Sequence, residues 1–167
     1  MRIQGKTRII ALLGVFIALS FILSYIDTVL SSSFAFVPGM KIGLAGIVTL
    51  VAFAFLKKRF IIIMLLARCL LTFAVFGSVT SLMFSLAGAF LSFCLMCISY
   101  GRISHIKTSV SGGVSHNIAQ VLVAIFITGT PLVIWQMPYL MITGCISGFI
   151  MGFIVSLILP RITKVIK

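Results

Sequence analysis

The chain has 167 residues, of which 62% are hydrophobic and 8% charged, and its formal net charge is +12. About 25% of the residues of a soluble domain are charged, so this composition excludes a disordered chain and a soluble domain. The basic residues stand in short clusters between long apolar runs rather than on one water-facing surface. This pattern argues against nucleic-acid binding and predicts an integral membrane protein whose partner is the lipid bilayer.

The first predicted membrane span covers residues 9–25 and follows the basic residues Arg2, Lys6 and Arg8. The region resembles a signal peptide, but residues 9–26 form an uncharged run of 18, longer than the usual apolar region of about 7–15 residues. We therefore expect a span that is retained in the mature protein.

Five further spans are predicted from the remaining apolar runs. The turn between the third and fourth falls on residues 76–81, where glycine and hydroxyl residues interrupt the run. The last 53 residues before Arg161 carry no formal charge, and as one helix they would be about 80 Å long against an apolar core of about 30 Å. A hairpin at residues 128–131, with Pro138 following, divides them. The five spans are 39–56, 60–77, 82–100, 114–130 and 137–159.

The basic residues also predict the orientation. Under a six-span count, 11 of the 13 basic residues fall on one side of the membrane, and only Lys41 and Arg68 do not. The positive-inside rule places that side in the cytoplasm. The sequence therefore predicts a single all-α domain over residues 1–167, a six-helix bundle in the cell membrane with both termini cytoplasmic.

Small residues recur at helical spacing in four of the spans. Lipid gives no hydrophobic drive between helices, so such stripes let backbones approach closely. One alternative is that a stripe docks a separate membrane subunit, and the first span is the best candidate. The stripes are Gly14 and Ala18; Gly39, Gly43 and Gly46; Ser81, Ser85, Gly88 and Ser92; and Gly144, Gly148, Gly152 and Ser156.

Arg68 lies eight residues into the third span, near mid-membrane. An arginine at that depth costs about 2.5–3.5 kcal/mol on insertion scales, so its side chain should face the bundle interior or a wet cavity. It either tethers helix-end carbonyls or recognises an anionic group, because a guanidinium donates hydrogen bonds in pairs to carboxylate or phosphate.

Two other charged residues lie near the predicted outer side. Asp27 is the only acid in the chain, and it either pairs with Lys41 or Arg68 or is solvated at the rim. Lys41 follows Pro38 and Gly39 in a stretch typical of a broken helix start, where it either lines the mouth of a cavity or snorkels to the interface.

The most polar stretch beside a span is residues 111–120. His116 and Gln120 are four residues apart and share a helix face, and Asn117 flanks them. These side chains either bond neighbouring helices or line a site. Gly112 and Gly113 predict a loose or interrupted helix start.

Several kinds of chemistry lack the residues they need. In the polar stretch, His116 without a carboxylate or an aligned cysteine gives too few ligands for a metal site. One acid cannot supply the carboxylate cluster of Mg²⁺-dependent diphosphate chemistry, and no P-loop is present for ATP hydrolysis. We expect a protein that is not an enzyme and holds no cofactor. Cys94 and Cys97 are the only hint of a redox group, and all four cysteines are interpreted as buried apolar residues.

Taken in order, these motifs resemble the Gx transporter family, whose members are often labelled heptaprenyl diphosphate synthase component I. The resemblance rests on residues 24–27, 38–45, 68–77, 81–88 and 115–120 and covers nearly the whole chain. The chain departs from the family pattern at Asp27, where Glu is expected, and at Gly46, where Asn is expected. Both changes put a shorter side chain near the presumed site, so the identity of the ligand stays open.

The resemblance implies three functions in the bacterial inner membrane. The first is a substrate-binding S component of an energy-coupling factor (ECF) vitamin transporter, which captures a small molecule and docks on a transmembrane subunit driven by ATPases. Gly14 and Ala18 resemble the docking motif of such proteins. The second is a membrane subunit of extracellular electron transfer that works with flavin or quinone, and the third is a component of polyprenyl diphosphate synthesis.

We favour the first, a subunit that binds a small anionic, isoprenoid or vitamin-like molecule. Its expected binding residues are Asp27, Lys41, Arg68, His116, Asn117 and Gln120.

Overall fold

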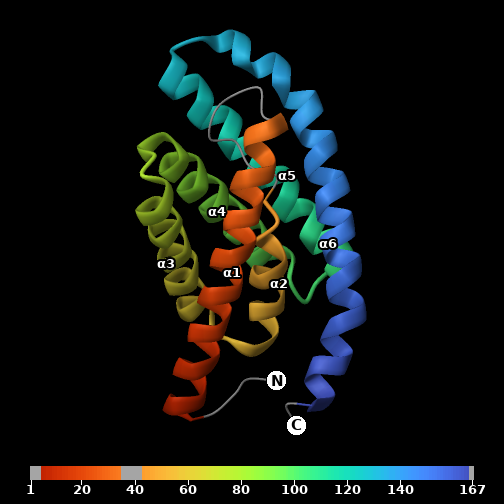
Figure 1. The fold of residues 1–167 in the computed structure, drawn as a ribbon. Coiled ribbons are helices and arrows are strands. Elements are labelled where there is room, and N and C mark those ends of the chain that lie inside the picture. Colours follow the sequence, from red (N-terminus) through yellow and green to blue (C-terminus); the bar gives the residue numbers. More distant parts are fainter. Residues whose placement is uncertain (1–4, 35–42, 166–167) are drawn as a thin grey trace.

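The structure is a computed structural model that describes residues 5–34 and 43–165. These residues form six α-helices and one short 3₁₀ helix (Figure 1), and the described part contains no strand. The helices are α1 (Lys6–Phe34), α2 (Gly46–Phe55), α3 (Lys58–Phe76), α4 (Val79–Ser99), α5 (His105–Thr128), η1 (Pro131–Gln136) and α6 (Met137–Val165).

Five of these helices are long and apolar enough to cross a membrane, so the chain is a helical membrane protein as its composition indicates. The exception is α2, whose ten residues span about 15 Å, half of a bilayer core of about 30 Å. The predicted six-span count is therefore not confirmed. Residues 39–42 of the predicted second span lie outside the described residues.

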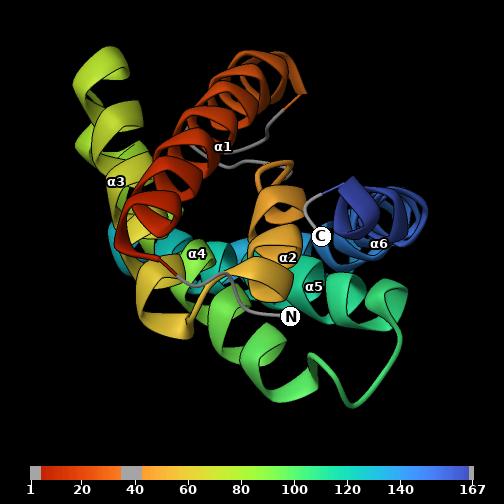
Figure 2. The ribbon, with the colours of Figure 1, turned by 90° about the horizontal axis from the view of Figure 1, so that it is seen from below.

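The short helix α2 occupies the centre of the bundle. It contacts α1, α3, α4, α5 and α6, which are arranged around it when the bundle is seen from below (Figure 2). A helix surrounded by protein need not match the bilayer thickness, because its neighbours rather than lipid cover its ends. This central place explains why half of its residues are buried: Val48, Thr49, Leu50, Ala52 and Phe55.

Glycines end two of the long helices. Gly77 closes α3 at φ +64° and Gly129 closes α5 at φ +63°, in the left-handed conformation that favours glycine. Ser78 then caps α4 by accepting a hydrogen bond from the Ser81 N–H (3.1 Å). The break between α3 and α4 is thus shorter than the predicted turn over residues 76–81, while Pro131 follows Gly129 at the predicted hairpin.

Helix α5 differs most from the sequence-based expectation. It begins at His105, behind a Ser104 cap that accepts from the Lys107 N–H (3.3 Å), and continues without interruption through Gly112 and Gly113. These glycines serve packing rather than a break: a Cβ on Gly112 would lie 2.2 Å from the Met96 side chain, and one on Gly113 would lie 2.5 Å from the Gly144 carbonyl oxygen.

The α5–α6 contact is a glycine interface. A Cβ on Gly148 would lie 2.7 Å from the Cα of Val110, and one on Gly152 would lie 2.6 Å from the Cα of Ile106. Together with Gly144, this stripe of α6 packs backbone against backbone. The stripe on α4 is buried as well: Ser81, Ser85, Gly88 and Ser92.

The start of α1 and the end of α6 lie at one end of the bundle (Figure 1), together with the start of α3 and the α4–α5 turn. We call this the basic end, since its exposed cations include Lys57, Lys58, Arg59, Arg102 and Lys107. The larger apolar core cluster fills this half and includes Leu50, Phe55, Ile61 and Met64. A smaller cluster of Phe84, Val121 and Ala124 lies toward the opposite end.

Candidate functional site

Arg68 lies in the middle of α3 and points into the bundle. Its side chain is only 6% exposed, and its Nε is buried without a hydrogen-bond partner. Leaving a charged donor unsatisfied is costly in a bundle interior, so such a group needs an explanation. A cavity lies beside it.

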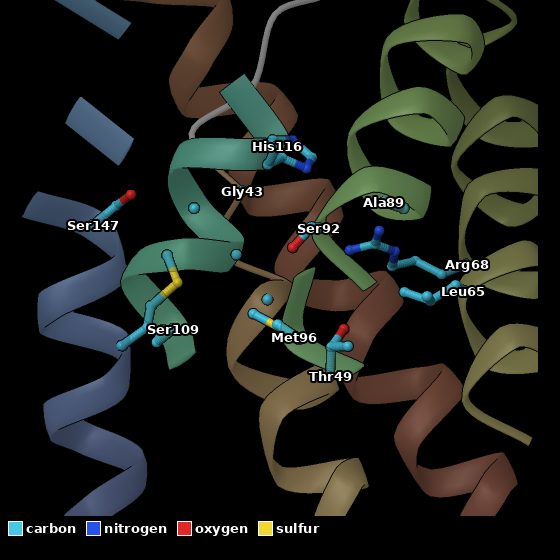
Figure 3. Close-up of a pocket in the computed structure, with 14 residues that line it drawn as sticks. Gly43, Thr49, Leu65, Arg68, Ala89, Ser92, Met96, Ser109, His116 and Ser147 are labelled. Atoms are coloured by element: carbon cyan, nitrogen blue, oxygen red, sulfur yellow. The ribbon is translucent and has the colours of Figure 1, made fainter. Parts of the chain in front are cut away.

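Two small cavities meet at Arg68. The larger has about 20 Å³ in which the centre of a water molecule can lie, and the smaller has about 10 Å³. By this measure the larger cavity can hold one or two water molecules and the smaller at most one. Gly43, Arg68 and His116 line both. Figure 3 shows the larger one, with the guanidinium of Arg68 pointing toward Ser92 and His116 above it.

The cavities are stacked along the bundle. Along α3, which starts at the basic end, the larger cavity is lined by Leu65 and the smaller by Thr72, with Arg68 between them. Helix α4 runs the opposite way and gives the opposite order, Ser85 before Ser92. We therefore call the larger one, nearer the basic end, the inner cavity and the smaller one the outer cavity.

Asp27 lines the outer cavity from α1 and is 2% exposed. Its carboxylate accepts hydrogen bonds from the backbone N–H groups of Gly43 (2.8 Å) and Leu44 (3.2 Å). Gly43 has φ +93°, a conformation that favours glycine. Asp27 thus joins α1 to the chain just before α2. Asp27 does not accept a hydrogen bond from the Nε of Arg68, which has no partner. Lys41 lies outside the described residues, so a pair between Asp27 and Lys41, and the place of Lys41 at a cavity mouth, stay predictions.

His116 and Gln120 lie on one face of α5, as their spacing predicts. The Nε2 atoms of the two side chains are 3.0 Å apart, and because an amide nitrogen only donates, the His116 ring nitrogen accepts. The ring occupies the space left by Gly88 of α4, where a Cβ would lie 2.4 Å from Cε1. His116 is therefore positioned at the junction of the two cavities, while Gln120 is fully buried behind it.

Asn117 contacts α6 rather than a cavity. Its Nδ2 donates to the Leu140 carbonyl oxygen (2.6 Å) and to the Thr143 hydroxyl (3.4 Å), and its Oδ1 is buried without a partner. Two uses were expected for this polar stretch. Asn117 bonds to a neighbouring helix, and His116 lines a cavity.

The remaining candidates lie away from the cavities. Gly14 and Ala18 are exposed on α1, and no atom lies within 4 Å of a Cβ built on Gly14. The prediction of four buried cysteines is right for Cys69, holds in part for the half-buried Cys94 and Cys97, and is wrong for Cys145, which is exposed. Among the described residues no group of three or more histidine, cysteine or acidic side chains could hold a metal ion.

Sequence reasoning did not single out three hydroxyl residues of the inner cavity: Thr49 of α2, Ser109 of α5 and Ser147 of α6. Single serines and threonines in apolar spans are common, and only the three-dimensional arrangement shows that these converge. The fourth hydroxyl, Ser92, belongs to the small-residue stripe of α4, whose packing role conceals its place at the cavity.

The sequence pattern of a protein family described as heptaprenyl diphosphate synthase component I matches residues 16–158, and these include every described residue of both cavities. No curated protein matches the chain. No solved structure matches it either.

Proposed function

The chain belongs to the heptaprenyl diphosphate synthase component I family, and we propose that it is a non-enzymatic membrane subunit that captures a small anionic molecule. The mode of action would be that of an S component of an ECF transporter. One observation carries the proposal: the buried guanidinium of Arg68 has an unpartnered Nε and faces a polar cavity.

The energetics favour a ligand over a purely structural role. A buried cation inside a membrane bundle costs several kcal/mol unless it is paired, about 2.5–3.5 kcal/mol even on the lenient insertion scales. A structural tether would use its donors on protein groups, whereas the Nε of Arg68 donates to none, and the guanidinium that carries it points toward the cavity (Figure 3). Carboxylate and phosphate are the groups that fit a guanidinium.

Other groups complete the proposed site. His116 shares both cavities with Arg68 and would orient the polar part of the ligand, with Gln120 fixing its ring. Asp27 holds Gly43 at the junction. Lys41 would supply a second cation at the outer mouth, and Asn117 would keep α5 and α6 together around the site.

The family name speaks of a component, which implies that the chain works with other subunits. We propose that catalysis, where there is any, resides in another subunit, because this chain has a single acid to bind Mg²⁺. The exposed Gly14–Ala18 stripe on α1 would dock a transmembrane subunit that is coupled to ATPases.

The test is mild purification followed by mass spectrometry of bound small molecules, for the wild type, Arg68→Ala and Arg59→Ala. Arg59 is a matched control, since it lies on the same helix but is exposed at the basic end. We expect a small acid bound to the wild type and to Arg59→Ala and lost from a folded Arg68→Ala protein. Equal retention by Arg68→Ala, or a coloured flavin or quinone in place of the acid, would contradict the proposal.

A further inference from the structure

We propose that the anionic group of the ligand sits in the inner cavity, on the side of Arg68 that faces the basic end; this inference rests on the proposed function. Hydroxyl groups from four different helices converge there. They belong to Thr49 of α2, Ser92 of α4, Ser109 of α5 and Ser147 of α6.

Two of these hydroxyls have their hydrogen-bonding capacity open. Ser92 and Ser109 are 9% and 2% exposed, and neither side chain makes a hydrogen bond to another described residue. Thr49 and Ser147 donate to carbonyl oxygens of their own helices, each over a long 3.4 Å. A buried hydroxyl without a protein partner bonds to whatever occupies the cavity, and each of these can donate one hydrogen bond to an anion.

The charges separate the two cavities. The carboxylate of Asp27 lines the outer cavity and would repel an anion there. The residues around the inner cavity include no acid. An anion is therefore more stable on the inner side of the guanidinium.

The size of the inner cavity limits the chemistry. Room for one or two water molecules fits a small, singly charged group such as a carboxylate or a halide and excludes a diphosphate. Gly112 leaves this room, since a Cβ there would lie 3.1 Å from the Ser92 hydroxyl oxygen and 2.2 Å from Met96. The anion is either free in solution or the acidic end of a larger molecule whose remainder extends past His116.

The experiment uses formate as the probe. The full-length protein is purified in gluconate, whose anion is too large for the cavity, and formate is titrated at constant ionic strength while the thermal unfolding midpoint is followed by circular dichroism. A ligand that binds only the folded state raises this midpoint. The variants are Ser92→Ala, Ser109→Ala and the matched control Ser85→Ala, which removes a hydroxyl of the outer cavity from the same helix as Ser92.

We expect formate to raise the unfolding midpoints of the wild type and of Ser85→Ala at similar concentrations. Ser92→Ala and Ser109→Ala should need at least a tenfold higher formate concentration for the same rise. Mass spectrometry identifies the source of the anion. If formate displaces a bound organic acid, the anion is the acidic end of a larger ligand; if no acid is bound, the anion is free in solution. Either result, together with the formate response, supports the inner site.

If only Ser85→Ala lost the stabilisation by formate, the anion would lie in the outer cavity and the inference would be overturned. A wild type that retains an acid through Arg68 but does not respond to formate would also overturn it, although the proposed function would then stand. If no acid is bound and formate has no effect, both fail.

Discussion

At the scale of single residues, Arg68 distinguishes a structural from a functional use of a buried charge. A tether stabilises the folded state, so its removal should destabilise the protein. An anion-binding cation does the opposite when no ligand is present, because its desolvation is not compensated. The unpartnered Nε supports the second use.

We therefore predict that Arg68→Met raises the thermal unfolding midpoint of the ligand-free protein, by an amount that corresponds to about 1–3 kcal/mol. Methionine fills a similar space without a charge. Thermal unfolding in detergent by circular dichroism, in buffer free of small anions, measures the change. A drop of several degrees would assign Arg68 to a structural tether.

Asp27 has a different role, since its carboxylate bonds to two backbone N–H groups across helices. We predict that Asp27→Ala lowers the free energy of unfolding by about 1.5–3 kcal/mol, because hydrogen bonds to a charged group are lost and buried donors are left without it. Unfolding in mixed micelles checks this.

Asp27→Asn serves as the comparison, since it keeps one acceptor oxygen and should lower the free energy of unfolding by less. An equal loss in Asp27→Asn and Asp27→Ala would instead show that the charge, and not the pair of backbone bonds, holds α1 in place.

At the scale of helices, the interface of α5 and α6 depends on glycines that face backbone. We predict that Gly148→Ala lowers the free energy of unfolding by about 1–3 kcal/mol, since the added methyl would overlap the Cα of Val110 and neither backbone can yield easily. Gly14→Ala is the control, because nothing lies within 4 Å of that position and alanine favours the helix. Similar unfolding midpoints for the two variants would contradict a close-packed interface.

Much of the helical pattern could be predicted from the sequence. Long uncharged runs and the breaks at Gly77 and Gly129 place four of the long helices, because a helix in lipid has to be apolar along its length. The helix in the second predicted span was expected, but the shortness of α2 was not: its 10 residues are as apolar as a span, and only contact with five other helices makes a short helix stable there. Gly112 and Gly113 look like a helix break, whereas neighbouring helices use them as packing space.

The site was partly predictable for a related reason. Arg68, His116 and Asp27 are costly in a membrane, so their presence alone indicates buried polar contacts. Thr49, Ser109 and Ser147 carry no such signal, because a hydroxyl can bond to its own helix and be tolerated anywhere in a span. Which hydroxyls share a cavity depends on helix rotation, and periodicity does not fix that.

At the scale of the whole molecule, the exposed basic residues of the described part gather at one end, and the positive-inside rule predicts that this end is cytoplasmic. We expect a cysteine at position 130, in the α5–η1 turn, to react with a membrane-impermeant maleimide in intact cells. A cysteine at position 104, in the α4–α5 turn, should react only after permeabilisation. Both are placed in a background in which the four native cysteines are replaced by serine. Labelling of position 104 in intact cells would reverse the topology.

The central claim is that the bundle keeps a cation for a visiting anion. An experimental structure of the protein purified with its bound ligand tests it most directly, through the density beside the guanidinium of Arg68. The account predicts an anionic group within hydrogen-bonding distance of the guanidinium, on the Ser92 side. Density that shows every guanidinium nitrogen bonded to protein groups, with side chains filling the inner cavity, would contradict it.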